Sequence, residues 1–142
     1  MKHHIYSPLI VMPIRHARES SMHREGKQLL GLLLSSRQYH VLFEHRLSDV
    51  VAFKRSANQI RVVCGEHELT NRNVHRNVRR NIGNRCDAIV ILVPSNHARA
   101  SVRRLLQRTF PREVWNRIGI VTHEACCRRL QTNSADYPAR PN

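Results

Sequence analysis

Acidic residues, lysine and aromatic residues are all scarce in this chain of 142 residues. Ten acidic residues stand against 24 lysines and arginines, which gives a formal net charge of +14, and lysine occurs only at Lys2, Lys27 and Lys54. Such an excess repels itself unless an acidic partner neutralises it. Because arginine binds phosphate through paired hydrogen bonds and stacks on bases, the excess favours nucleic acid over a membrane surface as the partner. The alternative is a solvated basic surface that keeps the protein soluble.

Long apolar runs and metal-ligand motifs are also missing. The apolar run 88–93 is far too short to span a bilayer, and residues 1–14 lack the apolar stretch of a signal peptide. Neither a CxxC motif nor a Cys/His ligand spacing occurs at the four cysteines, which are Cys64, Cys86, Cys126 and Cys127. We therefore expect a cytoplasmic protein without a membrane segment, with buried, reduced thiols. The ten histidines are scattered, and no prediction rests on them.

The spacing of apolar residues predicts elements in the order α, β, β, β, α, β, α, β. Helices are expected at 21–36, 71–82 and 97–110, and strands at 39–43, 49–54, 60–69, 86–94 and 118–122. The helix before the fourth strand implies a crossover and some parallel pairing. We therefore predict an α/β protein of three layers, α/β/α, around a mixed sheet. Residues 1–130 should form one domain, and residues 131–142 a flexible tail.

Three of the scarce acids are expected to meet on one hairpin, between the second and third strands. With the turn between Ala57 and Asn58, paired residues have numbers that sum to about 115, so Asp49 lies opposite Glu66. Side chains two apart share a face, which adds Glu68. Adjacent carboxylates raise one another's pKa unless a cation holds them, and such ligands suit Mg²⁺ or Mn²⁺. The alternative is that Glu66 and Glu68 point outward, solvated and paired with nearby arginine.

This order of elements and acids resembles the PD-(D/E)XK nuclease superfamily, whose fold is restriction-endonuclease-like. The resemblance runs from about residue 19 to residue 122 and rests on two motifs, Ser48-Asp49 and Glu66-His67-Glu68. It implies catalytic roles for Asp49, Glu66 and Glu68, with a Mg²⁺ ion held by Asp49 and Glu66.

In the same family a glutamate on the first helix often completes the site. Glu25 fits this role because it lies one turn from Met22 and Leu29, on the side that we expect to face the core. Glu19 is the weaker candidate for the same position. The resemblance therefore adds Glu25 to the expected catalytic residues.

The sequence departs from the family pattern at two positions. Ser48 replaces a proline, which matters little, and Glu68 stands where lysine is usual. The family's lysine positions the attacking water and stabilises charge on the phosphate, so an acid cannot act identically. Some restriction endonucleases of this family carry Glu-x-Glu and remain active, the second glutamate being proposed to act on the water. The resemblance therefore permits activity.

The segment 71–85 is rich in arginine and contains no acid. On a helix, neighbouring turns would carry Arg72, Arg76, Arg79 and Arg80, beside Asn73, Asn77 and Asn81. Such a surface suits phosphates, and asparagine can contact base edges. A second basic face is expected on the next helix, at Arg99, Arg103, Arg104 and Arg108. Because aromatic residues make up only 5% of the chain, we expect the backbone of a duplex to be bound rather than stacked single-stranded bases.

Two functions follow from these patterns. The first is a Mg²⁺- or Mn²⁺-dependent nuclease that hydrolyses phosphodiester bonds in double-stranded DNA, as a homodimer where both strands are cut, because one compact site cuts one strand. The second is a non-catalytic nucleic-acid-binding protein on the same scaffold, which Glu68 and the shortness of the chain favour. A third is an assembly protein whose arginines meet an acidic protein partner.

Overall fold

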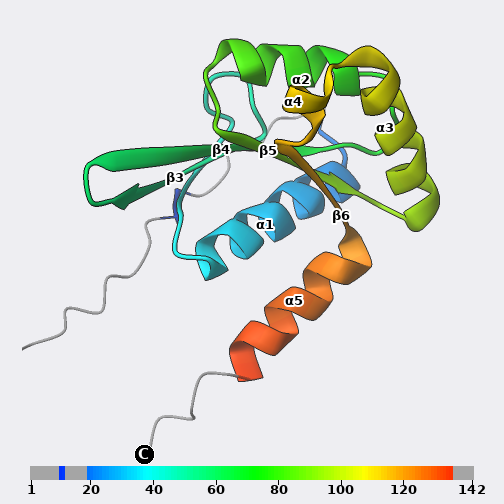
Figure 1. Cartoon of the computed structure of the whole chain (residues 1–142). Helices are drawn as coiled ribbons and strands as arrows, with labels where there is room; N and C mark the ends of the chain where they lie inside the picture. Colours follow the sequence, from blue (N-terminus) through cyan, green and yellow to red (C-terminus); the bar gives the residue numbers. More distant parts are fainter. Residues whose placement is uncertain (1–9, 12–18, 136–142) are drawn as a thin grey trace, which may run out of the picture.

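A mixed sheet of six strands forms the centre of the protein in a computed structural model, which describes residues 10–11 and 19–135 (Figure 1). In order across the sheet, the strands are β1 (Ile10–Val11), β2 (His40–Phe43), β3 (Val50–Ser56), β4 (Gln59–His67), β5 (Ala88–Val93) and β6 (Ile118–Thr122). β2, β3 and β4 form an antiparallel meander, whereas β1 runs parallel to β2, and β4, β5 and β6 run parallel to one another. The carboxyl ends of β4, β5 and β6 therefore meet at one end of the sheet.

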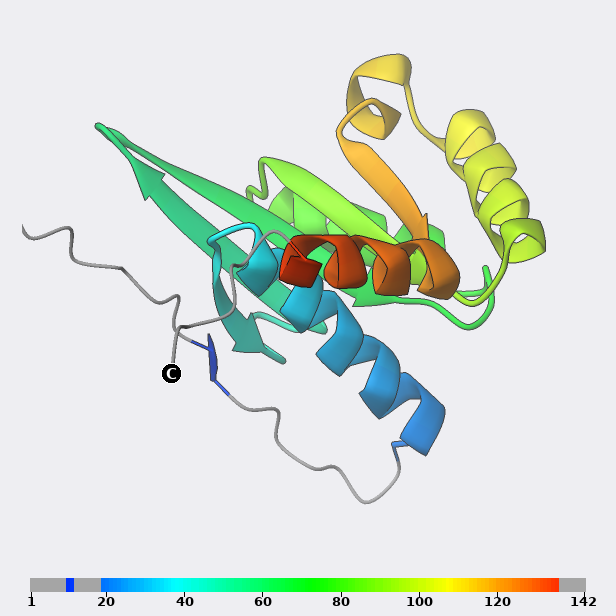
Figure 2. The same ribbon diagram turned by 90° about the horizontal axis from the view of Figure 1, so that it is seen from below.

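Helices cover both faces of this sheet, and the predicted three-layer α/β/α architecture is confirmed. One face is covered by α1 (Ser21–Ser36) and α5 (His123–Ala135), and the other by α2 (Val74–Gly83), α3 (Asn96–Thr109) and the short α4 (Arg112–Trp115) (Figures 1 and 2). We call these the α1 side and the α2 side. The helices α2 and α3 are the crossovers that parallel pairing of β4, β5 and β6 requires.

The helix α1 forms because its sequence supplies both a start signal and an apolar stripe. The Ser20 hydroxyl accepts a hydrogen bond from the backbone N–H of His23, which satisfies one of the free donors at the helix start. Leu30, Leu33 and Leu34 are buried against the sheet, and each stabilises the fold by about 1.5–3 kcal/mol. This packing fixes which residues of α1 reach the end of the sheet.

Strand β4 contributes side chains to both sides in alternation. Val63 belongs to the core on the α1 side, where a side chain at Gly65 would also collide with Leu30. Cys64 belongs to the core on the α2 side. By the same alternation Glu66 and His67, at the end of β4, face opposite sides of the sheet.

The predicted hairpin register is confirmed. Val51 pairs with Cys64 and Phe53 with Val62, and the turn falls between Ser56 and Gln59. The predicted helix 21–36 and strand 118–122 match α1 and β6, and the other predicted elements end within a few residues of the observed ones.

The predicted flexible tail is wrong for residues 131–135, because α5 continues to Ala135. Few apolar residues mark this helix, and Cys126 and Leu130 are among those that pack on the core. Residues 136–142 of the predicted tail lie outside the described residues. No helix in the described ranges has the length and apolar character needed to cross a bilayer.

The expectation of reduced, buried cysteines is wrong for three of the four. Cys64 and Cys86 form a disulfide with a Cα–Cα distance of 6.1 Å. Their pairing follows from the fold, because Cys86 precedes β5 and β5 lies beside β4. Cys126 is a buried free thiol as expected, whereas Cys127 is exposed.

Candidate functional site

Asp49, Glu66 and Glu68 come together where β4 ends and β3 begins. The backbone N–H of His67 donates to Asp49 Oδ2 at 2.8 Å, which places Asp49 level with Glu66. Glu66 and Glu68 are only 2% and 8% exposed. The alternative is therefore wrong in placing these two glutamates in solvent, although the pairing with arginine that it included does occur between Glu66 and Arg80.

Helix α2 holds both glutamates through its side chains. Glu66 Oε1 accepts hydrogen bonds from Arg80 Nη2 at 3.0 Å and from Asn81 Nδ2 at 2.8 Å. Glu68 Oε1 accepts one from Asn77 Nδ2. Asn81 and Asn77 lie one turn apart on α2, so one face of this helix supplies the partners of both carboxylates.

The predicted role of the α2 asparagines at base edges is wrong for Asn81. Asn81 is fully buried, and besides binding Glu66 it accepts a hydrogen bond from the Ser48 hydroxyl. A buried amide with both ends bonded is not available to a nucleic acid. Ser48 is thus part of the network that orients Glu66.

The carboxylates on the α2 side carry more negative charge than their partners offset. Burial and then the charge of Asp49 raise the pKa of Glu66 to about 7. Burial also raises the pKa of Glu68, and the charge of Asp49 adds to the effect. For Asp49, burial acts in the same direction, but bonding to His23 and to the His67 backbone N–H holds its pKa below the ordinary value. Asp49 is therefore ionised at neutral pH, whereas Glu66 is part-protonated.

The donor set at this end of the sheet suits a hard divalent cation. Mg²⁺ in proteins usually takes one or two carboxylates and completes its shell with water and phosphate oxygens. Asp49 and Glu66 supply such a pair, and a cation beside them would lower the pKa that their proximity raises at Glu66. Within residues 10–11 and 19–135, no three His, Cys, Asp or Glu side chains are arranged to hold a metal ion by themselves.

The structure does not bring Glu25 to this site. Glu25 is exposed, and Met22, expected on the core-facing side, is 57% exposed. The core-facing side of α1 instead carries Gly26 and Lys27, both buried. The prediction is wrong because it took Met22 as part of the apolar stripe, which shifted the assumed orientation of the helix.

Glu19, the weaker candidate, is the acid that does approach the site. It precedes α1, its side chain is only 6% exposed, and it forms an ion pair with Lys27 Nζ. Lys27 also binds Glu44 and is 2% exposed. Although burial opposes its charge, the hydrogen bonds that Lys27 donates to Glu19 and Glu44 raise the pKa of Lys27. Sequence analysis missed Lys27, although a rare lysine within the apolar stripe of a helix is a recognisable signal.

Three histidines line the α1 side of the same region, and sequence analysis missed all of them. His23 Nδ1 lies 3.1 Å from His67 Nδ1, and His67 Nε2 lies 2.8 Å from His123 Nε2. His23 Nε2 is 3.4 Å from Asp49 Oδ1, and this contact raises the pKa of His23. Burial, with the charges of the other two histidines, lowers the pKa of His67 to about 4. Strand alternation could have indicated His67, because a residue between Glu66 and Glu68 must face the first helix.

The predicted arginine surface is retained at three of its four positions. Arg72, Arg76 and Arg79 are exposed. Arg79 lies over the ring of Phe110, at 5.9 Å from its centroid. Arg80 differs, because it is half-buried and paired with Glu66. Its role is to neutralise a carboxylate of the site.

A hollow of about 180 Å³ opens beside Glu68. It lies between the connection from β4 to α2 and the first turns of α3, and its lining includes Asn71, His97 and Ser101. The hollow gives water and a small group access to one of the three carboxyl groups from the α2 side.

Comparison with known proteins supports the fold alone. No protein-family model matches the sequence, and no curated protein matches it. Two solved structures of the SAVED/CARF-domain-containing receptor Cap4 of Acinetobacter baumannii are similar, each with a TM-score of 0.51 and 13% sequence identity. One of them contains the cyclic trinucleotide 3'3'3'-cAAA. The matches cover 89% of this chain and 40% and 39% of the receptor chains, so this chain spans about two fifths of the length of the receptor.

Proposed function

We propose that this protein is a metal-dependent nuclease that hydrolyses phosphodiester bonds, with DNA as its substrate. The observation that carries the proposal is the meeting of Asp49 with Glu66 at the end of the sheet, where the charge of Asp49 helps to raise the pKa of Glu66 to about 7. A bound cation would relieve the repulsion between two buried carboxylates of this kind. The net charge of +14 on the protein attracts a phosphate backbone.

The residues of the site divide the work of hydrolysis. Asp49 and Glu66 are the ligands for Mg²⁺ or Mn²⁺, which stabilises negative charge on the phosphate and acidifies water when bound. Glu68 borders the hollow beside the site, where its carboxyl group can accept a proton from the attacking water. His23 orients Asp49 through the contact between Nε2 and Oδ1.

The exposed arginines are the proposed contacts to the DNA backbone. Arg72, Arg76 and Arg79 lie on or just before α2, the helix that also binds Glu66 and Glu68. Each contact to a phosphate should steepen the salt dependence of binding by about one unit of slope. Replacing these arginines should therefore weaken binding to all DNA sequences alike.

Cleavage of supercoiled plasmid by the purified protein tests the proposal. We expect cutting with Mg²⁺ or Mn²⁺ and none in EDTA, and a loss of about 100-fold or more in Asp49→Asn and Glu66→Gln. Glu25→Gln is the matched control, because Glu25 is an exposed glutamate of the same chain, and it should cut as the native protein does. A nicked product indicates one site acting at a time, whereas a directly linear product indicates a homodimer. Folded protein that cuts with neither metal, or full activity in Asp49→Asn, would overturn the proposal.

The second candidate is a non-catalytic nucleic-acid-binding protein on the same scaffold. It is favoured by the pairing of Glu66 with Arg80 and Asn81, which already partners this carboxylate without a metal. Salt-dependent DNA binding without cleavage, and no Mg²⁺ binding in calorimetry, would support this candidate instead. The cyclic trinucleotide of the Cap4 structure is a useful second ligand in the same binding assay.

A further inference from the structure

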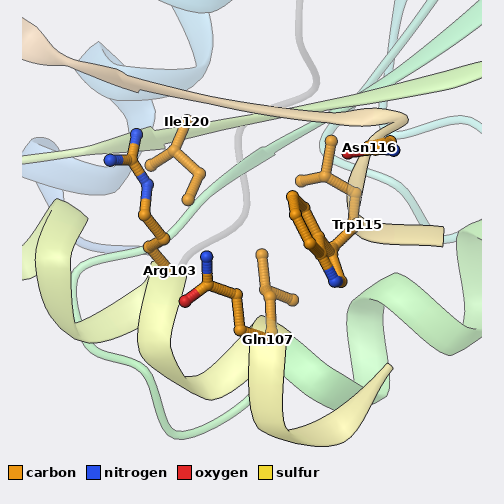
Figure 3. A pocket seen from close by; sticks show the side chains of 7 residues that line it. Arg103, Gln107, Trp115, Asn116 and Ile120 are labelled. Atoms are coloured by element: carbon orange, nitrogen blue, oxygen red, sulfur yellow. The ribbon is translucent and has the colours of Figure 1, made fainter. Parts of the chain in front are cut away.

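A separate pocket of about 340 Å³ lies on the α2 side, between α3, α4 and the strand β6 (Figure 3). Leu106, Ile118 and Ile120 form its apolar lining. The polar lining consists of Arg103, Gln107, Trp115 and Asn116. Arg103 and Trp115 stand on opposite sides of the pocket, with the Gln107 amide between them (Figure 3). None of these residues belongs to the proposed nuclease site.

The polar groups of the pocket are available to a ligand. Within the described part of the chain, the side chains of Arg103, Gln107, Trp115 and Asn116 form no hydrogen bond or ion pair with another residue. Trp115 is also the one tryptophan of the sequence. A wide aromatic surface, two free amides and a guanidinium thus face one space.

We propose that this pocket binds one nucleotide, with its base against the indole of Trp115 and its phosphate on Arg103. Every base has a flat face that stacks on an aromatic ring, and Gln107 and Asn116 can each donate to and accept from the edge of a base. Arginine binds phosphate through two parallel hydrogen bonds. A volume of about 340 Å³ lies at the lower end of the range for small-ligand pockets, which suits a single nucleotide.

Adjoining hollows link this pocket to the acidic site. Gln107 also borders a hollow of about 470 Å³ that is lined by Arg104 and Arg108. That hollow in turn shares Asn71 and Ser101 with the one beside Glu68. A nucleotide at Trp115 can therefore be free or part of a strand whose backbone crosses α3 toward the acids, since both sources present a base and a phosphate.

Tryptophan fluorescence tests the proposal, because Trp115 is the sole source of the signal. The full-length protein is titrated in EDTA with AMP, with a short single-stranded oligodeoxyadenylate and with inorganic phosphate. We expect saturable quenching by AMP or by the oligonucleotide, and about tenfold weaker binding in Arg103→Gln. Arg99→Gln is the matched control, an exposed arginine of α3 that lies outside the pocket, and should bind as the native protein does.

The ligands and variants separate the possible outcomes. Tighter binding of the oligonucleotide than of AMP shows that the nucleotide belongs to a strand, and equal binding shows a free nucleotide. Calorimetry of Trp115→Leu should show binding at least about tenfold weaker, from the lost stacking. The proposal fails if neither ligand quenches, if inorganic phosphate quenches as strongly, or if Arg103→Gln binds as well as Arg99→Gln. Asp49→Asn should bind AMP as the native protein does. AMP binding therefore tests this pocket even if the nuclease proposal fails.

Discussion

The two sides of the sheet neutralise their buried carboxylates in different ways. On the α1 side, Lys27 binds both Glu19 and Glu44, and Arg24 Nε lies 3.9 Å from Glu19 Oε2, so two cations meet two carboxylates. On the α2 side, Glu66 and Glu68 are partnered by one guanidinium and two amides. An amide donates a hydrogen bond but supplies no net charge, so among these groups the negative charge exceeds the positive charge on the α2 side.

This difference distinguishes ion pairs that support the fold from carboxyl groups that can take part in a reaction. The pairing on the α1 side raises the pKa of Lys27, so its ion pairs stay charged and stabilise the fold. On the α2 side, burial and then the charge of Asp49 leave Glu66 with a pKa of about 7, where a small change in its surroundings alters its charge. Asp49 stands between the two sides, since His23 holds it from the α1 side while its charge acts on Glu66.

The largest effect is expected from removal of the cation on the α1 side. Lys27→Met removes the shared partner of Glu19 and Glu44, whose side chains are only 6% and 16% exposed, and should lower the free energy of unfolding by about 3–5 kcal/mol. Urea denaturation measures the change. Lys54→Met is the matched control, because Lys54 is exposed and should change the value by less than about 1 kcal/mol. Equal stabilities of the two variants would show that Lys27 does not support the fold.

A pH-dependent effect is expected next, from the α2 side. The pKa of Glu66 rises from 4.5 to about 7, so the folded protein binds a proton more tightly than the unfolded chain does. The free energy of unfolding should therefore fall as pH rises through this range, by at most roughly 3 kcal/mol from this group. In Glu66→Gln this contribution disappears, and urea denaturation in EDTA across the range measures the difference from native protein.

The effect of Glu66 must be taken as the difference between native protein and Glu66→Gln, because His67 changes the free energy of unfolding with pH in the opposite direction. Its pKa of about 4 lies below the ordinary 6.5, so its contribution to stability is lost as pH falls through the same interval. Glu113→Gln, at an exposed glutamate, should keep the native pH profile. Added Mg²⁺ should stabilise the native protein above about pH 7 more than it stabilises Glu66→Gln. Identical profiles for native protein and Glu66→Gln would contradict a surplus of charge on the α2 side.

A larger side chain at Gly26 tests how tightly the α1 side is packed around His67. A Cβ atom at Gly26 would lie 2.3 Å from the ring of His67, so Gly26→Ala must displace the central histidine. We expect a loss of about 1–3 kcal/mol in the free energy of unfolding. Gly83→Ala is the matched control, at a helical glycine whose Cβ would meet nothing within 4 Å, and it should be neutral or slightly stabilising. A neutral Gly26→Ala would mean that His67 has room to move.

The hairpin was predictable because its signals are local. The turn at Ala57 and Asn58 and the alternation of β3 and β4 together define the register, and the register brings Asp49 level with Glu66. The architecture followed from the order of elements, since a helix before the buried strand β5 requires a crossover.

The partners of the acids were not predictable in the same way. Whether Arg80 binds a phosphate or a carboxylate depends on which face of α2 packs on the sheet, and the apolar stripe of α2 is narrow. The arrangement of His23, His67 and His123 draws on three separate elements, and only the packed fold brings them together. Strand alternation indicates which side of the sheet His67 faces, but composition and spacing do not indicate which side chains it contacts there.

The smallest effect is expected at Glu25, where sequence and structure disagree most directly. Because Glu25 is exposed, Glu25→Gln should change the free energy of unfolding by less than about 0.5 kcal/mol. Glu19→Gln removes a charge from the ion pair with Lys27 and should cost about 1.5 kcal/mol. Urea denaturation of the two variants side by side measures both values. The reverse ranking would restore the helix orientation that the sequence suggested, and with it the assignment of Glu25 to the site.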